Sequence, residues 1–129
     1  MKDELKEGLE GKWFIETTPE MAAQHIAEEE GILVYSTPAM VWHMERAAVL
    51  AVRGYLDDDE VSVGVRVDIS HIAGTAIGET VRAAARLVKV EERRLTFTVE
   101  AYNEHEKIGD GRHQRVVVKR DRLPRKGSR

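Results

Sequence analysis

Glu45 is a carboxylate in an apolar stretch of sequence, where a charged group can serve acid–base chemistry. It falls within Pro38–Arg53, a run of helix-forming and apolar residues that leaves almost no polar face. A helix that is apolar nearly all round is a buried helix, and a charge inside it is costly unless it is paired or has a function. Taken alone, Glu45 is equally well interpreted as a catalytic group or as a salt-bridge partner, for example of Arg46 or Arg53 of another subunit.

His71 is the second residue that departs from its local pattern. Apolar and polar residues alternate from Val61 to Ile69, which is typical of a strand with one buried face, and His71 continues the apolar parity. A single histidine on such a face is more often a core residue with a hydrogen-bond partner. A carboxylate on the helix and an inward imidazole on the neighbouring strand nevertheless form the commonest general acid–base pair, which favours a catalytic role for both.

Thr37 is a third candidate because of its place at the start of the apolar helix. Ser36-Thr37-Pro38 predicts a threonine N-cap followed by proline at the first helical position, which is a structural role. The N–H groups of a helix start also point outward and can bind an oxyanion or a phosphate. His43 on this helix and His113 on the last strand are weaker candidates, for which we favour packing or surface roles.

The elements that must position these residues follow from the periodicity of the sequence. Trp13–Thr18 predicts a first strand, Pro19 starts a short helix, and Pro38–Arg53 forms the long buried helix that Gly54 ends. Four strands joined largely by hairpins then follow, and the fold class is α+β, an antiparallel sheet wrapped around one helix in a single domain over residues 1–129. The strands are expected at Val61–His71, Val81–Leu87, Leu95–Ala101 and Lys107–Arg120.

Three further segments are interpreted as structural. The acidic run Asp57–Glu60 lacks the spacing of a calcium loop and is expected to be a solvated loop. Gly109-Asp110-Gly111 is expected to mark a place in a strand where the backbone needs room. The basic segment Arg122–Arg129 is expected to be a flexible tail.

Composition excludes several classes of function. The chain has 129 residues, a net charge of −3 and no cysteine. A dedicated nucleic-acid-binding domain is usually strongly basic, and the lack of cysteine excludes disulfide scaffolds and thiol nucleophiles. The charged start of the chain argues against a signal peptide, and no stretch reaches the roughly 18 apolar residues of a membrane span. We therefore expect a cytoplasmic protein without a metal site.

Four segments resemble the hotdog-fold thioesterases, and most closely the fluoroacetyl-CoA thioesterase group. The resemblance is carried by a Thr-x₇-Glu spacing followed by a Gly-x₆-His strand, and it covers most of the chain from Thr37 onward. The segments are Ser36–Glu45, Val63–His71, Val90–Phe97 and Ile108–Arg115.

The resemblance implies a hotdog fold, acyl-CoA thioester hydrolysis without a cofactor, and a homodimer with its active site at the subunit interface. It implies that Thr37, Glu45 and His71 correspond to the catalytic residues of the family. Gly64 falls on the glycine that lies beside the acyl group. We also expect Ala39 and Met40, at the helix start, and Arg115, in the last matching segment, to bind the substrate. These seven positions are Thr37, Ala39, Met40, Glu45, Gly64, His71 and Arg115.

The spacing of the first two residues constrains how such a site can be built. Eight residues along a straight helix span about 12 Å, so Thr37 and Glu45 of one chain are too far apart to touch unless Thr37 lies off the helix on a folded-back turn. One subunit supplying Thr37 and the other supplying Glu45 would resolve this. Several roles stay open: Glu45 attacks directly or activates water, Thr37 positions the acyl carbonyl or is the nucleophile, and His71 transfers the proton.

One departure bears on specificity. Fluoroacetate-specific members place a phenylalanine gate six residues before the threonine, and here that position is Gly31, so fluoroacetyl specificity is not expected. The resemblance by itself implies a short acyl group. By residue type alone, the CoA phosphates could be bound by Arg82, Arg86, Lys119 or Arg120. The competing interpretations are another hotdog chemistry, such as an acyl dehydratase, and a non-catalytic acyl-CoA-binding or regulatory dimer.

Overall fold

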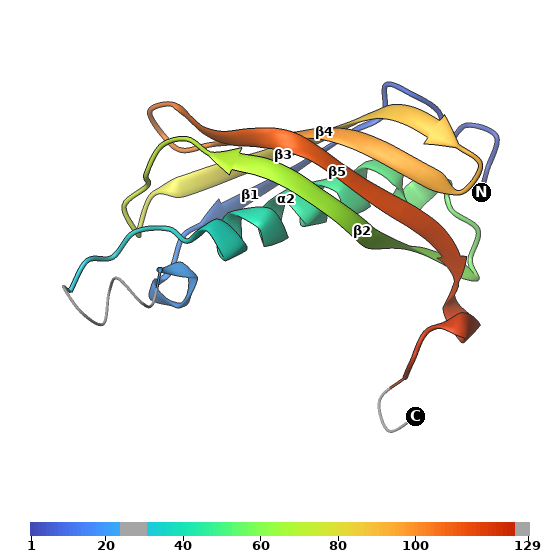
Figure 1. Cartoon of the computed structure of the whole chain (residues 1–129), viewed down its shortest axis with the longest axis horizontal. Helices are drawn as coiled ribbons and strands as arrows, with labels where there is room; N and C mark the ends of the chain where they lie inside the picture. Colours follow the sequence, from blue (N-terminus) through green and yellow to red (C-terminus); the bar gives the residue numbers. More distant parts are fainter. Residues whose placement is uncertain (24–30, 126–129) are drawn as a thin grey trace.

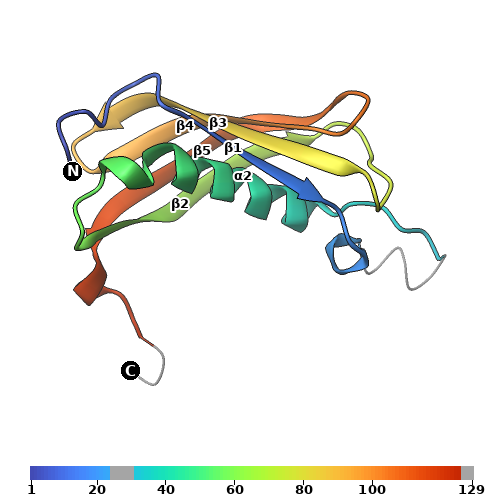
Figure 2. The ribbon, with the colours of Figure 1, turned by 180° about the vertical axis from the view of Figure 1, so that it is seen from behind.

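The computed structural model describes residues 1–23 and 31–125, which form a curved five-stranded antiparallel sheet with one long helix along one face (Figures 1 and 2). The strand order is β1-β3-β4-β5-β2, so β1 and β2 are the edge strands. The predicted antiparallel sheet around one long helix is confirmed. The elements are β1 Glu10–Glu16, the 3₁₀ turn η1 Pro19–Met21, α2 Thr37–Val52, η2 Arg53–Tyr55, β2 Glu60–His71, β3 Thr80–Glu91, β4 Arg94–Tyr102, β5 Lys107–Lys119 and η3 Arg120–Arg122.

The start of α2 differs from the predicted cap by one residue. Ser36 is the N-cap, and its Oγ accepts a hydrogen bond of 3.1 Å from the Ala39 N–H. The prediction that Thr37 caps the helix is therefore wrong, because the preceding serine supplies an equally good cap oxygen. The correction matters for the site, since the Thr37 hydroxyl is left for another partner.

The core forms where small residues let α2 approach the sheet closely. α2 packs mainly against β1 and β3, and a side chain at Gly11 would collide with the Ala47 carbonyl oxygen and the Ala51 backbone. Phe97 of β4 is completely buried beneath the helix, as is Leu87 of β3. Because so little space separates the helix from the sheet here, the backbone path of α2 is firmly fixed.

The apolar parity of β2 does not produce the buried face that the sequence predicted. Val65 and Val67 are 49% and 44% exposed, and a register shift between Gly64 and Arg66 interrupts the pairing with β5. The alternation predicts that one side of the strand faces the helix along its whole length, but β2 is an edge strand and α2 lies mainly over β1 and β3. An edge strand with exposed valines is a surface that favours pairing with another chain.

α2 is also less enclosed than its composition predicted. Its buried side includes Met40, Met44 and Ala48, whereas Trp42 on the other side is 59% exposed. One copy of the chain therefore leaves part of the apolar surface on this outer side of α2 uncovered. No helix within the described residues is long and apolar enough to span a bilayer.

Some local predictions need correction. Glu60 is not part of a solvated loop: it is 2% exposed and binds the Met1 ammonium at 2.6 Å and Arg93 at 2.5 Å, whereas Asp57–Asp59 are exposed as expected. α2 ends at Val52, and the chain continues through η2 past Gly54.

The remaining local predictions concern short segments. The short helix after Thr18 is the single turn η1 in the described part of the chain, without a side-chain cap. Its predicted continuation over residues 24–30 lies outside the described residues, as does the tail over residues 126–129. Gly109 lies where a side chain would not fit, as expected, since a Cβ there would lie 2.6 Å from the Met40 side chain.

Candidate active site

Thr37 and His71 meet at one end of the molecule. Thr37 is the first residue of α2 and His71 is the last residue of β2. The Thr37 Oγ1 lies 2.8 Å from the His71 Nδ1, and the two share a hydrogen bond. Two of the predicted catalytic residues, 34 positions apart in sequence, are thus brought into direct contact within one chain.

The His71 imidazole is poised for proton transfer. Burial lowers its pKa below the ordinary value of histidine, so the ring is neutral near neutral pH and can accept a proton. Its second nitrogen, Nε2, is buried without a hydrogen-bond partner among the residues that the structure describes. A buried ring nitrogen without a partner is unusual, and it leaves one position of the ring available for a group from outside this chain.

Tyr35 and His43 form a buried pair behind His71. The Tyr35 hydroxyl is hydrogen-bonded to the His43 Nδ1, and the two rings are stacked 5.7 Å apart. Burial lowers the pKa of His43 and raises the pKa of Tyr35, so the phenol donates and the neutral imidazole accepts. The Tyr35 ring also meets His71 edge-on at 6.3 Å. His43 is therefore a buried packing residue, one of the two roles favoured for it from the sequence.

A hollow opens beside the Thr37–His71 pair. Its volume is about 850 Å³, and its walls are largely apolar. This size lies within the usual range for small-molecule sites. Its lining includes the two polar residues and the apolar residues Ala22, Ala23, Val34, Ile72 and Ala73.

Glu45 lies in a second polar group, at the middle of α2. Its Oε2 is 3.3 Å from the Arg115 Nη1 and 3.7 Å from the His113 Nε2. Within this chain the salt-bridge partner of Glu45 is therefore Arg115, and a pairing with Arg46 or Arg53 of another subunit stays a prediction. Arg46 instead lies over the Trp13 ring, at 5.0 Å from its centroid.

Arg115 is itself tightly held. Its side chain is 7% exposed, and its Nε and Nη2 donate hydrogen bonds of 2.9 Å to the Ser62 Oγ and the Ser62 carbonyl. A buried guanidinium with this many partners has little freedom to move. Glu45, 35% exposed, is consequently a carboxylate with one side anchored and one side open.

Gly64 provides the space over that carboxylate. A Cβ at this position would lie 2.5 Å from the Glu45 Oε2 and 3.3 Å from the Arg115 Nη1. Only a residue without a side chain leaves the carboxylate where it is. Gly64, Glu45 and Arg115, predicted separately from the sequence, therefore lie together.

The predicted site residues thus fall into two groups in one chain. Thr37 and His71 lie at the start of α2, whereas Glu45, Gly64 and Arg115 lie at its middle, as the rise of the helix requires. Ala39 and Met40 have their N–H groups engaged by Ser36, and the Met40 side chain is completely buried. A substrate contact by these last two stays a prediction, and Met40 has no accessible side-chain atoms in one chain to make it.

Two further residues, Ser62 and His113, belong to the second group. The sequence does not predict a site role for Ser62 and predicts only a packing or surface role for His113. A signal for His113 is present in the sequence, because His113 and Arg115 share the strand parity of the apolar Val117, and the structure buries all three. Two polar residues on the inward parity of a strand indicate a polar cluster, as Glu45 did on the helix.

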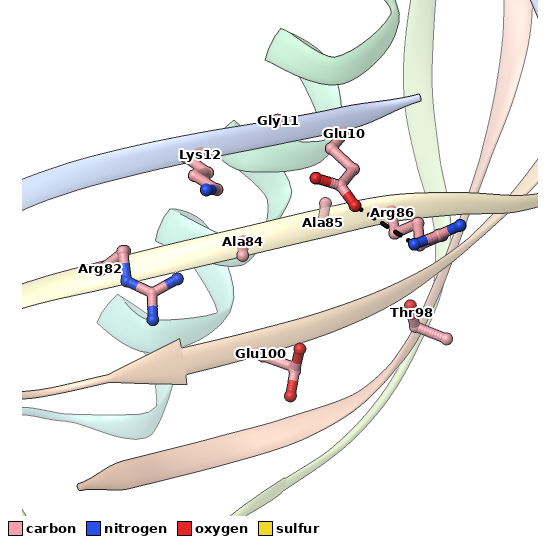
Figure 3. Close-up of a pocket in the computed structure, with 9 residues that line it drawn as sticks. All are labelled: Glu10, Gly11, Lys12, Arg82, Ala84, Ala85, Arg86, Thr98 and Glu100. Carbon is pink, nitrogen blue, oxygen red and sulfur yellow. Dashed lines mark hydrogen bonds and ion pairs between the residues drawn. The ribbon is translucent and has the colours of Figure 1, made fainter. Parts of the chain in front are cut away.

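The cations proposed for CoA phosphates already have partners. Arg82 and Arg86 line a hollow on the face of the sheet away from α2, together with Glu10 and Glu100 (Figure 3). Arg86 is paired with Glu10 at 3.3 Å, and Arg82 lies over the Tyr102 ring. Lys119 pairs with Asp59, and Arg120 donates to the Asp58 carbonyl. Over residues 1–23 and 31–125, no group of three or more histidine or acidic side chains could hold a metal ion.

Comparison with known proteins shows the family to which the chain belongs. The model of a family described as fluoroacetyl-CoA-specific thioesterase, FlK, matches residues 17–121. The fluoroacetyl-CoA thioesterase of Streptantibioticus cattleyicolor is 35% identical over 123 residues, which cover 92% of this chain and 88% of that protein. The sequence-based resemblance is thereby confirmed.

Solved structures give the same result for the fold. The fluoroacetyl-CoA thioesterase FlK superposes with a TM-score of 0.84 at 33% identity, covering 92% of both chains. A thioesterase superfamily member from Thermus thermophilus gives 0.81 at 35% identity, covering 92% of this chain and 88% of the other. Variants of FlK have been solved with fluoroacetate and CoA and with acetyl-CoA. A hot-dog-like protein from Thermanaerovibrio acidaminovorans gives 0.79 at 25% identity, covering 89% of this chain and 84% of the other, and the predicted hotdog fold is confirmed.

Proposed function

The chain belongs to the fluoroacetyl-CoA-specific thioesterase family and is an acyl-CoA thioesterase; from this premise we propose that it hydrolyses short-chain acyl-CoA at a site shared by two copies of the chain. Thr37 and His71 of one protomer would face Glu45 of its partner. The observation that carries the proposal is the 2.8 Å contact between Thr37 and His71, with Glu45 anchored separately on the same helix.

The homodimer is supported by what one copy leaves uncovered. β2 is an edge strand whose Val65 and Val67 are about half exposed, and Trp42 of α2 is 59% exposed. Apolar residues next to an unpaired strand edge are typical of a surface that another chain covers. A dimer across this surface would bring the start of one α2 toward the middle of the other, which is where the two polar groups lie.

The chemistry divides between these two groups. The thioester carbonyl would lie at the start of α2, where the Thr37 hydroxyl and the helix dipole stabilise the tetrahedral oxyanion. Glu45 of the partner takes a proton from a water molecule, whose oxygen adds to the acyl carbon. The neutral His71 imidazole takes up the proton that Glu45 accepted and passes it to the departing sulfur as the carbon–sulfur bond breaks. The products are the free acid and CoA, and Glu45 and His71 return to their starting protonation states.

The acyl group is proposed to be short. Relatives of this chain have been solved with acetyl-CoA and with fluoroacetate, and the hollow beside Thr37 has apolar walls that suit a small acyl group. Gly31 stands where fluoroacetate-specific members place a phenylalanine. We therefore propose a thioesterase that does not distinguish fluoroacetyl from acetyl strongly.

A panel of acyl-CoA thioesters, assayed for free thiol, tests the activity. Free CoA release from short acyl substrates is the expected result. Acyl-CoA binding without release by the intact protein would contradict the proposal and indicate a binding module.

Mixed dimers test which chain supplies which residue. When Thr37→Ala and Glu45→Ala chains are refolded together, a mixed dimer holds one site with both residues intact, so we expect about a quarter of wild-type activity to return. The matched control mixes Thr37→Ala with His71→Ala. These two residues come from the same chain, so every site stays damaged and no activity returns. Recovery in the control, or none in the first mixture, would refute the shared site.

A further inference from the structure

His113 is a buried histidine that the proposed chemistry does not use. It lies in the middle of β5, is 1% exposed, and stacks on the Phe97 ring of β4 with centroids 6.3 Å apart. Both of its ring nitrogens have partners. Nδ1 is 2.8 Å from the Arg66 carbonyl oxygen of β2, and Nε2 is 3.0 Å from the Arg115 Nη1.

These two partners determine where the imidazole proton lies. A backbone carbonyl can only accept, so Nδ1 must carry the hydrogen that is donated to Arg66. A guanidinium can only donate, so Nε2 must present its lone pair to Arg115. Both contacts are satisfied at once only by the neutral imidazole that is protonated on Nδ1.

This state of His113 determines the orientation of Arg115. Nη1 of Arg115 carries two N–H groups, one aimed at His113 and the other at the Glu45 Oε2, 3.3 Å away. The remaining contacts of this guanidinium go to Ser62, whose Oγ and carbonyl accept from Nε and Nη2. His113 therefore accepts one N–H of the Arg115 Nη1 and leaves the other N–H directed at Glu45.

The register shift in β2 belongs to the same arrangement. It falls between Gly64, which leaves room for the Glu45 carboxylate, and Arg66, whose carbonyl accepts a hydrogen bond from the His113 Nδ1. A bulge in a strand turns one backbone group out of the regular ladder and often re-aims groups next to active sites. Here both neighbours of the irregular position contact the cluster around Glu45.

We propose that His113 is a positioning residue that acts through Arg115: as a neutral imidazole it orients the guanidinium, which in turn holds the Glu45 carboxylate aimed over Gly64. This inference rests on the proposed function, because it assigns His113 a role in preparing Glu45 for catalysis. His113 itself does not contact the reacting atoms.

Acid should disturb the arrangement in a defined way. The charged side chains that face His113 are Glu45 from α2 and Arg115 from its own strand, while β2 offers only the Arg66 carbonyl and β4 the Phe97 ring. Protonation at Nε2 would set an N–H against the N–H of Arg115 and draw the ring toward Glu45, 3.7 Å away. Burial lowers the pKa of His113, so the neutral form persists below the pH at which a free histidine takes up its proton.

Two substitutions separate the contacts of the two ring nitrogens. In His113→Asn, the side-chain amide nitrogen falls near the position of Nδ1 and can still donate to Arg66, but nothing accepts from Arg115. In His113→Gln, the longer side chain carries an oxygen to the region of Nε2, where it can accept from Arg115, while the donor to Arg66 is lost.

We expect His113→Gln to retain most of kcat and His113→Asn to lower it by about 10- to 100-fold, because a small misplacement of a catalytic group has such a cost. The loss in His113→Asn should fall on kcat and leave KM nearly unchanged, since His113 does not contact the substrate. Equal losses of kcat in both variants, or a loss that falls on KM alone, would show that His113 is only structural and overturn the proposal.

A measurement on the unmodified protein decides the point even if a variant fails to fold. Long-range ¹H–¹⁵N spectra of protein labelled in its five histidines should show His113 protonated at Nδ1 and not at Nε2 near neutral pH. The opposite tautomer, or a charged ring, would refute the proposal. Glu45→Gln distinguishes the two levels: full activity in that variant refutes the proposed function, whereas an inactive Glu45→Gln with the wrong His113 tautomer refutes only this inference.

Discussion

The two polar groups along α2 are built in opposite ways. Thr37 is exposed at the helix start, it shares one hydrogen bond with His71, and the second nitrogen of that histidine has no partner in the described part of the chain. Glu45 lies against a buried arginine that is held by Ser62 and His113. The first group is left open for a substrate and a second chain, whereas the second is organised before either arrives.

The difference shows what fixes the positions of the side chains in each group. A carboxylate that must activate a water molecule for attack works best when its position is fixed before the substrate binds. A hydroxyl and an imidazole that receive the substrate can be completed by the substrate itself and by the partner subunit. Substitutions should therefore affect activity and stability in different proportions at the two groups.

The largest effect is expected from Glu45→Gln, which keeps the shape of the side chain and removes its charge. We expect kcat/KM to fall by about 10²- to 10⁴-fold, the usual contribution of a general base. The fold should be little changed, because the amide oxygen can still accept from Arg115. Thiol release from acetyl-CoA and thermal unfolding measure the two quantities, and activity within twofold of wild type would refute the role of Glu45.

The next largest effect is expected from Arg115→Met, which compares how much the two groups contribute to stability. The substitution fills a similar volume but leaves Ser62, His113 and Glu45 without a buried donor, so we expect a loss of about 2–3 kcal/mol in the free energy of unfolding. Thr37→Val, the counterpart in the open group, should cost less than about 1 kcal/mol. Both should impair hydrolysis. Denaturant titrations that give equal stability losses would show that the second group is no better organised than the first.

The sequence predicted the residues of both groups better than their surroundings. Glu45 and His71 stood out because a charged or polar side chain interrupts an apolar pattern, and that signal is local. The partner of Glu45 could not be found in the same way. Arg115 is 70 positions away, and only the pairing of β2 with β5 brings Ser62 and Arg115 under α2.

The elements of the fold were also predictable from local sequence signals. The errors in the predicted fold concern features that depend on residues far apart in the sequence or on a choice between equally good neighbours. Strand and helix ends agree with the predictions to within a few residues because hairpins and helix starts are marked locally. The prediction that the valines of β2 are buried was wrong, because the position of a strand in the sheet decides its burial. The alternating pattern that includes Val65 and Val67 is the same for a central strand and for an edge strand. Ser36 and Thr37 are both good caps, so the choice between them needed coordinates.

Two glycines offer a finer test of how the second group works. Gly64→Ala places a Cβ 2.5 Å from the flexible end of Glu45, so we expect the carboxylate to move and kcat to fall by about tenfold, with little change in the melting temperature. Gly11→Ala meets the rigid backbone of α2 instead and should lower stability by about 2 kcal/mol. A crystal structure or a melting curve that shows the reverse ranking would contradict the proposed geometry around Glu45.

The smallest effect concerns the acid sensitivity of folding. Burial lowers the pKa of both His113 and His71, so the unfolded chain binds protons at a higher pH than the folded chain. Stability is then fully present above the unfolded pKa of about 6.5 and is lost as the pH falls toward the lowered values in the folded state. His113 is almost completely buried and His71 only half-buried, so His113 should contribute more to the loss than His71.

We therefore expect the free energy of unfolding to fall less in His113→Gln than in wild type between pH 7 and pH 5. His71→Gln should reduce that loss by a smaller amount. His105→Gln is the matched control, because the His105 side chain is 73% exposed and the substitution should leave the acid dependence unchanged. Denaturant titrations at fixed protein concentration measure these differences. If His71→Gln had the larger effect, the helix-start group would be the more desolvated of the two, and the contrast between an open and a pre-organised half of the site would have to be reversed.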